Sequence, residues 1–388
     1  MKRIYLDHAA TTPLASEALQ AMLPFLRDTT GNPSSVHAEG RSVRAAVDAA
    51  RDRLAAVLGC AHREIVFTGS GSEADNLALR GVVERWSSER GRHVVVASIE
   101  HDAVLQTARR LAELGLIELT VMDCDAACRV DPDALAAAVR DDTVLVSLML
   151  VNNETGTIQD VAAAATAVHR RNATTLVHTD AVQGPGRVPI QPAPLGVDLL
   201  TLSAHKVYGP KGVGALWVRH GVFLGMQITG GGQERNRRSG TENVPGIAGF
   251  ASAVELAERL GERESERQAA LAERLIDQVV ADTPGALVTG SPEHRAPGFA
   301  SFAFPGSRTD LLLTVLDGLG VAASGGSACS SGAATPSHVL LAMGLSQELA
   351  ASALRCTVGR DTTDADIDAA AAAICRAVRQ VRGTSAAA

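Results

Sequence analysis

The chain has 388 residues, of which 46% are hydrophobic and 20% are charged, and its formal net charge is −7. This composition is typical of a soluble globular protein, and the negative charge argues against direct binding to nucleic acid or to an anionic membrane. No apolar run approaches the roughly 18 residues that span a bilayer, and the six cysteines lack the density of a disulfide framework. Because the N-terminal residues do not resemble a signal peptide, we expect a cytoplasmic protein.

Short β-branched segments alternate with longer, alanine-rich segments over most of the chain. The predicted strands are Ile65–Thr68, His93–Ser98, Ile117–Met122, Val144–Met149, Thr175–Thr179, Leu199–Ser203 and Ala215–Val218. The predicted helices lie near Val36–Leu58, Ser72–Ser88, Ala103–Leu114, Val161–Arg171 and Ile247–Ala281. This alternation predicts an α/β fold with a mainly parallel, seven-stranded sheet and helices on both faces. The continuous apolar strands are typical of strands buried in a parallel sheet.

The pattern changes after about Ser291. Pro297–Pro305 is predicted to form a strand and a turn, and a leucine-rich helix, a Ser/Gly/Ala loop at 324–335 and two more helices follow. This segment predicts a second, smaller α+β domain. We expect a large domain over residues 16–260, and a small domain made of residues 1–15 and 261–388.

Two polar residues follow consecutive predicted strands, where parallel α/β sheets bind their ligands. Lys206 follows the strand Leu199–Ser203, and a lysine in such a crevice can lose its proton and attack an aldehyde. Asp180 follows the preceding strand, and its carboxylate could keep the pyridine nitrogen of a pyridoxal cofactor protonated. Alternatively, Lys206 is a surface lysine and Asp180 only caps a helix.

A glycine-serine turn, Gly69–Ser72, joins a predicted strand to a predicted helix. Free backbone N–H groups and the helix dipole make such a turn an anion site. The turn lacks both the Walker spacing and the dinucleotide-binding spacing, so a phosphate monoester is the better ligand. A simple capped helix start is the alternative reading.

Cys329 lies in Ser324–Gly332, a segment of small glycine, serine and alanine residues. A structural cysteine is usually buried among apolar neighbours, whereas a reactive thiol needs access. The composition therefore favours a functional role for Cys329.

These segments together resemble the NifS/IscS-type cysteine desulfurases, which belong to the fold-type I, aspartate aminotransferase-like pyridoxal-phosphate enzymes. The likeness covers nearly the whole chain and includes the segments Tyr5–Pro13, Gly31–His37, Glu100–His101, Val151–Gly156, Lys206–Gly212, Arg238–Asn243 and Arg355–Arg360. The Ser-Gly-Gly-Ser-Ala-Cys form around Cys329 resembles the class with an extended catalytic loop.

The resemblance implies how pyridoxal 5'-phosphate would be held. Lys206 would bind the cofactor covalently, Asp180 would pair with the pyridine nitrogen, and His101 would lie over the ring and assist proton transfers. Gln183 and Asn153 would contact the phenolic oxygen and the substrate side.

The resemblance also implies ligands for the phosphate and for the substrate carboxylate. The phosphate would be held by residues after two strands, namely Gly71, Ser72, Ser203 and His205, and by Thr241 from the partner subunit of a homodimer. Arg355 would bind the carboxylate bidentately, with Asn32 nearby. No metal ion is implied.

The implied reaction removes sulfur from L-cysteine, gives L-alanine and leaves a persulfide on Cys329. A sulfur-acceptor protein would then receive the sulfur for iron–sulfur cluster assembly, transfer RNA thiolation, thiocofactor synthesis or DNA phosphorothioation. Rival readings are another fold-type I activity, such as an aminotransferase or a selenocysteine lyase, and a non-catalytic scaffold that relays sulfur on Cys329. A scaffold has no use for Lys206, Asp180 and Arg355.

Overall fold

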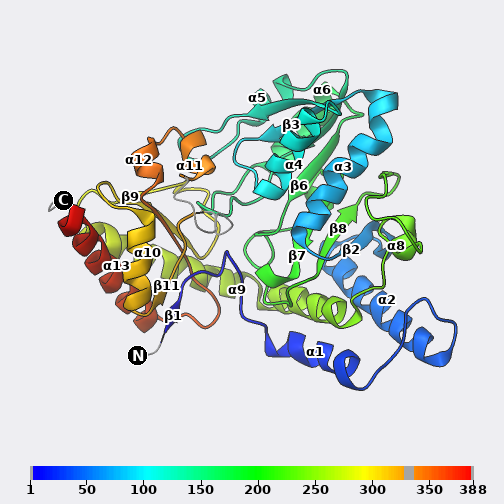
Figure 1. Cartoon of the computed structure of the whole chain (residues 1–388), viewed down its shortest axis with the longest axis horizontal. Coiled ribbons are helices and arrows are strands. Elements are labelled where there is room, and N and C mark those ends of the chain that lie inside the picture. Colours follow the sequence, from blue (N-terminus) through cyan, green and yellow to red (C-terminus); the bar gives the residue numbers. More distant parts are fainter. Residues whose placement is uncertain (1–2, 327–335, 386–388) are drawn as a thin grey trace.

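The computed structural model describes residues 3–326 and 336–385 (Figure 1). Its main sheet has seven strands in the order β2-β8-β7-β6-β5-β3-β4. The strands are β2 (Ile65–Thr68), β3 (His93–Ala97), β4 (Glu118–Met122), β5 (Thr143–Ser147), β6 (Leu176–Asp180), β7 (Leu199–Ser203) and β8 (Gly214–Val218). Strand β8 runs antiparallel to both of its neighbours, and the other strand pairs are parallel. The predicted mainly parallel, seven-stranded sheet is therefore confirmed.

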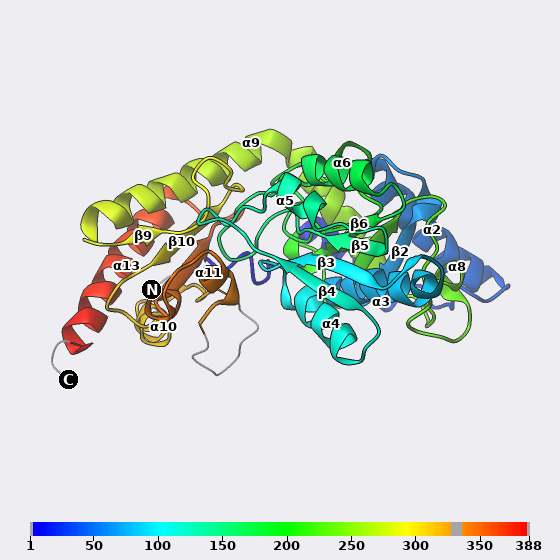
Figure 2. The same ribbon diagram turned by 90° about the horizontal axis from the view of Figure 1, so that it is seen from above.

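Helices cover both faces of this sheet, as the view from above shows (Figure 2). On one face, α3 (Gly71–Arg90) and α4 (Asp102–Glu113) pack against residues such as Val94 and Val96. On the other face, α2 (Ala38–Leu58), α6 (Val161–Arg171) and the first half of α9 (Val244–Asp282) pack against residues such as Val95 and Ala97. Alternate residues of one strand thus enter two separate cores, which explains why the central strands are largely apolar.

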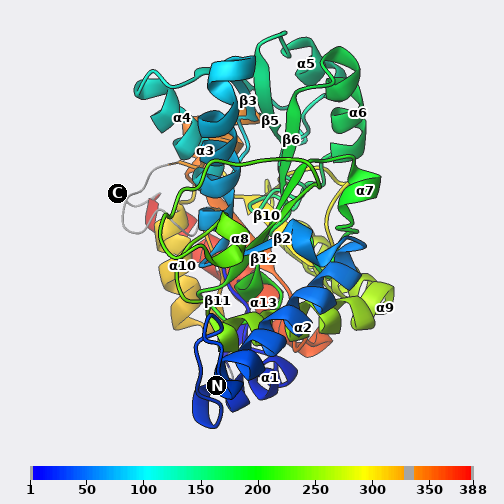
Figure 3. The same cartoon turned by 90° about the vertical axis from the view of Figure 1, so that its right-hand side faces the viewer.

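Helix α9 passes from the core at the main sheet into a second core (Figures 1 and 2). It is interrupted at Gly261, whose φ of 53° is a left-handed conformation that glycine adopts without strain. Helix α1 (Ser16–Arg27) and α2 pack against α9 (Figure 3). The second core contains Leu275 of α9 together with residues of the later strands and helices.

The second core is built around a three-stranded antiparallel sheet in the order β12-β10-β9. Its strands are β9 (Leu287–Val288), β10 (Phe299–Ala303) and β12 (Ala353–Thr357). The helices of this region are α10 (Thr309–Gly318), α11 (His338–Ala342), α12 (Gln347–Ala350) and α13 (Asp364–Ser385). The boundaries expected for the small α+β domain, residues 1–15 and 261–388, stay a prediction.

The prediction of only two helices after residue 335 is wrong, because two short helices and β12 precede α13. Strand β12 escapes a pattern search since Arg355, in its centre, interrupts the apolar run although the side chain is buried. The sequence also gave no clear sign of the shorter elements α5 (Pro132–Ala137), α7 (Pro192–Leu195) and α8 (Gln233–Asn236), or of the single turns at His62–Glu64 and Ala204–Lys206.

The N-terminal segment joins the later part of the chain rather than the main sheet. Strand β1 (Ile4–Tyr5) pairs in parallel with β11 (Val321–Ala322), and Leu6 lies in the second core. This pairing brings Asp7 and the residues after it against the carboxyl ends of the main-sheet strands. Within the described residues, no helix is both long and apolar enough to cross a membrane.

Candidate active site

A cavity of about 200 Å³ lies beyond the carboxyl ends of the main-sheet strands. Most of the predicted site residues line it, namely Gly71, Ser72, His101, Asn153, Asp180, Gln183, Ser203, His205, Lys206 and Arg355. Asn32 and Thr241 do not line it, and Cys329 lies outside the described residues. The carboxyl ends of parallel strands meet at one edge of a sheet, so residues far apart in sequence converge there.

One end of the cavity is suited to an anion. Helix α3 begins at Gly71, after the N-cap Ser70, whose hydroxyl accepts a hydrogen bond from the Glu73 N–H at 3.1 Å. A Cβ atom on Gly71 would come within 3.2 Å of the Ser203 Cβ, so glycine lets the helix start approach β7. The Ser203 hydroxyl is buried and has no hydrogen-bond partner in the described chain. An orphan hydroxyl facing a helix N-terminus fits a phosphate ester.

His205 lies at the same end of the cavity. Its Nδ1 atom is 3.2 Å from the Thr11 hydroxyl. Burial, together with the charges of Lys206 and Lys211, lowers the pKa of His205 to about 4. The imidazole is therefore neutral at pH 7, so it offers a bound anion a hydrogen-bond donor and no positive charge.

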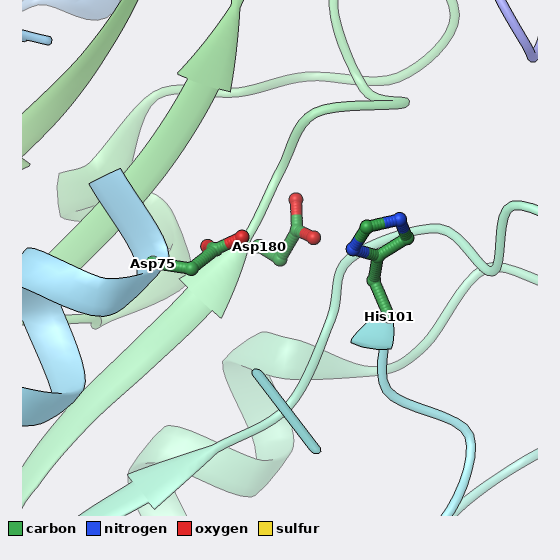
Figure 4. A group of neighbouring side chains, drawn as sticks. All are labelled: Asp75, His101 and Asp180. Carbon is green, nitrogen blue, oxygen red and sulfur yellow. The ribbon is translucent and has the colours of Figure 1, made fainter. Parts of the chain in front are cut away.

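Asp180 ends β6 in the middle of the cavity, and its carboxylate lies between Asp75 and the ring of His101 (Figure 4). One carboxylate oxygen accepts a hydrogen bond from the Val182 N–H at 2.9 Å. Burial raises the pKa of Asp180, while the charges of His101 and Lys206 lower it. His101 is also the N-cap of α4, where its Nδ1 atom accepts from the Ala103 N–H at 3.1 Å.

Lys206 reaches the N-terminal segment from the turn after β7. Its ammonium donates hydrogen bonds to the carbonyl oxygens of Ala9 and Ala10 at 2.5 and 2.8 Å. The Gln183 amide donates to the same Ala9 carbonyl at 2.9 Å. The N-terminal segment therefore holds the side chains of Lys206 and Gln183 at the carboxyl ends of the main-sheet strands.

Arg355, on β12, also lines the cavity. Its guanidinium donates to Asp7 at 2.9 Å and to the carbonyl oxygen of Asn153 at 2.7 Å. The side chain is buried, and its Nε atom has no partner among the described residues. This places a fixed cation where an amino-acid carboxylate could bind. Sequence reasoning missed the role of Asp7, because no local pattern links two residues so far apart in the chain.

Asn32 was expected near Arg355, but it does not line the cavity of its own chain. It is exposed, and its side-chain oxygen accepts from the N–H of Ser34. Arg44 donates both to the Pro33 carbonyl and to Glu242, at 3.1 and 2.9 Å, so it ties the loop of Asn32 to the segment that carries Thr241. Thr241 is exposed as well.

Two further cavity residues were missed from the sequence. Asp75 lies four residues after Gly71 in α3, and this helical spacing is a signal that it shares the cavity-facing side. His338, the first residue of α11, bonds through Nε2 to the Glu100 carbonyl at 3.0 Å and also lines the cavity. Nothing in the sequence around His338 distinguishes it from a surface histidine.

The chain is similar to known proteins over nearly its whole length. The sequence model of the family described as Aminotransferase class-V matches residues 4–370, and the chain belongs to that family. The cysteine desulfurase IscS of Dictyoglomus turgidum is 42% identical over 386 residues, which cover 99% of this chain and 97% of that protein. A solved NifS-like protein superposes with a TM-score of 0.90 at 36% identity, covering 96% of this chain and 98% of that one.

A second solved structure, of SspA in complex with cysteine, has a TM-score of 0.81 at 33% identity and covers 92% of this chain and 98% of that one. These relationships define the activity within the family. The protein is a cysteine desulfurase of the IscS/NifS type, with cysteine as its substrate and pyridoxal 5'-phosphate as its cofactor. The predicted fold class, activity and cofactor are confirmed.

Proposed function

We propose that the cavity holds pyridoxal phosphate with its phosphate at Gly71, Ser72, Ser203 and His205, its ring beside Asp180, and its reactive carbon at Lys206. The observation that carries this proposal is that a single cavity is lined by an anion site, a buried carboxylate, an amine and a guanidinium. When bound, the cofactor withdraws electrons from the Cα atom of the amino acid attached to it.

The chain's own residues supply the remaining steps. Arg355 binds the carboxylate of cysteine, with Asp7 and the Asn153 carbonyl holding the guanidinium in place. Lys206, once its amine is neutral, takes the proton from Cα, and His101 assists proton transfers above the ring. Asp180 keeps its negative charge beside the pyridine nitrogen, and Gln183 contacts the phenolic oxygen.

Cys329 is the proposed sulfur carrier. Its thiolate attacks the sulfur of the substrate, a sulfur–sulfur bond forms, and the carbon–sulfur bond breaks with its electron pair left on carbon. That carbon gains a proton and the product is L-alanine, while Cys329 holds the persulfide. In support, none of the five cysteines that the structure describes lines the cavity.

Replacing Asp180 with asparagine should slow removal of the α-proton at least about a hundredfold, because the shape stays and the negative charge is lost. Cofactor binding should persist, since the phosphate ligands are unchanged. Exchange of the α-proton of a bound amino acid in heavy water measures this step directly. Exchange at the normal rate in Asp180→Asn would contradict the assigned role.

We further propose that the active unit is a homodimer in which Thr241, with the loop of Asn32 beside it, completes the partner's site. In support, both residues are exposed, Arg44 holds their segments together, and neither reaches the cavity of its own chain. A phosphate ligand from the partner would make each site dependent on assembly.

Mixed dimers test this arrangement. Thr241→Val alone should weaken cofactor binding about tenfold, the scale of one hydrogen bond to a charged group. Dimers of one Thr241→Val subunit and one Lys206→Ala subunit should regain one site with normal affinity, because Lys206 of one subunit meets Thr241 of the other. If Thr241 serves its own chain, the mixed dimer gains nothing over the Thr241→Val dimer.

The sulfur would leave through an acceptor protein, in iron–sulfur cluster assembly, transfer RNA thiolation or DNA phosphorothioation. A protein intermediary agrees with the net charge of −7, which disfavours direct contact with nucleic acid. A reducing, cytoplasmic location is proposed because the five described cysteines are free thiols. Purifying the chain with cysteine present and identifying the protein that acquires labelled sulfur would distinguish these pathways.

A further inference from the structure

Two buried carboxylic acids face each other at the middle of the cavity. Asp75 is 1% exposed, and its carboxylate lies behind that of Asp180, on the side away from His101 (Figure 4). Polar atoms of Asp75, Asp180 and His101 all lie within 4.8 Å of one another. Two carboxylates this close in a buried site cannot both stay charged without a cation between them, so one of them holds a proton.

The surroundings of Asp75 favour its neutral form. Its Oδ1 atom has no hydrogen-bond partner in the described chain, and it lies 3.6 Å from Nε2 of His178. That histidine is already engaged, with Nδ1 at 2.9 Å from the Ser147 hydroxyl and Nε2 at 3.1 Å from the Thr201 hydroxyl. Burial lowers the pKa of His178 to about 3, so it is neutral and cannot serve as the cation for Asp75.

The charges that reach the two acids also differ. Asp180 is stabilised in its charged form by His101 and Lys206, which face it across the cavity. Burial raises the pKa of Asp75 well above its usual value, and the charges of Asp180 and of the buried Glu100 raise it further against a hydrogen bond with Thr201 that lowers it. Glu100 accepts a hydrogen bond from the Met149 N–H at 2.8 Å. The proton shared by Asp75 and Asp180 therefore belongs on Asp75.

We propose that Asp75 is a positioning residue. It is a neutral carboxylic acid behind Asp180 that donates a hydrogen bond to the Asp180 carboxylate, which stays negatively charged and faces the pyridine nitrogen. This inference rests on the proposed pairing of Asp180 with that nitrogen. This role of Asp75 is separate from the helix start at the glycine-serine turn and from the packing of α3.

Three variants of the cofactor-loaded enzyme test the proposal, with the protonation of ¹⁵N-labelled pyridoxal phosphate followed by nitrogen NMR and with cofactor affinity measured alongside. Asp75→Asn, which keeps a neutral donor of the same shape, should retain a protonated pyridine nitrogen and normal affinity. Asp75→Leu, which has no donor, should lose protonation at neutral pH and bind the cofactor about tenfold more weakly, equivalent to about one unit of pKa. Loss of protonation in Asp75→Asn, or its retention in Asp75→Leu, would overturn the proposal.

Asp180→Asn is the third variant, and it separates the two claims. If its pyridine nitrogen stays protonated, the pairing of Asp180 with the cofactor is wrong whatever Asp75 does. If Asp75→Leu fails to fold, infrared spectroscopy of the wild-type protein decides the question instead. A protonated carboxyl band present at neutral pH and missing from Asp75→Asn supports the proposal, and identical spectra of the two proteins overturn it.

Discussion

Replacing Lys206 with alanine should abolish the covalent attachment of the cofactor and reduce alanine release from cysteine at least about a thousandfold. Lys206 is the only lysine that lines the cavity in the described part of the chain, and its amine lies between the acid Asp180 and the carbonyls of Ala9 and Ala10. The variant loses both the attachment point and the group that removes the α-proton, so no single residue can compensate.

The chain makes this experiment simple to interpret, because it has only three lysines, Lys2, Lys206 and Lys211. Borohydride reduction of the wild-type enzyme should fix the cofactor on the peptide that contains Lys206. Lys211→Ala is the matched control, since Lys211 is exposed and lies outside the cavity, and it should be yellow and active. Cofactor fixed on Lys211, or turnover by Lys206→Ala, would show that the assignment is wrong.

Replacing Cys329 with serine should eliminate the persulfide while leaving cofactor and cysteine binding intact, because the groups that bind both remain. Alanine should not form without an added thiol. The described cysteines are poor substitutes: Cys128, Cys356 and Cys375 are buried, and burial raises the pKa of Cys60 and Cys356 to about 12. A thiol with such a pKa is roughly one ten-thousandth thiolate at pH 8, and the thiolate is the nucleophile.

Mass spectrometry after incubation with cysteine locates the sulfur. The best control is Cys124→Ser, because Cys124 is only half-buried and its hydrogen bond with Cys128 lowers its pKa. This control should still carry an extra sulfur on Cys329 and release alanine at the normal rate. An extra sulfur on Cys124 or Cys60 with Cys329 unmodified, or normal turnover by Cys329→Ser, would refute the role of Cys329.

The main sheet could be predicted because both of its faces are covered. The central strands are then largely apolar, and polar residues at or just after their carboxyl ends line the cavity, as with Asp180 at the end of β6 and Lys206 after β7. The second core was harder to predict. Strand β12 carries the buried Arg355, whose charge is compensated by Asp7 from the opposite end of the chain. A local sequence pattern does not indicate such a distant partner.

Site residues at the end of a predicted strand could be found from the sequence. Residues that reach the site only through contacts with distant parts of the chain could not. Asp75 is an ordinary helix residue in sequence, and only the fold shows that it lies behind Asp180. Asn32 matched a family motif, but the motif does not say which subunit's cavity it would serve, and Asn32 does not line the cavity of its own chain. Both cases depend on tertiary or quaternary contacts that local spacing does not encode.

The contact between Asp7 and Arg355 also determines when the site can be completed during translation. Lys206 and its carbonyl partner Ala9 are 197 residues apart, whereas Arg355 and Asp7 are 348 residues apart. A ribosome that adds roughly 5–20 residues per second needs about 17–70 s to make those 348 residues. The nascent chain therefore holds Lys206 and its partner Ala9 well before it holds both Asp7 and Arg355, and the contact between Asp7 and Arg355 forms only after the last strand, β12, has been made.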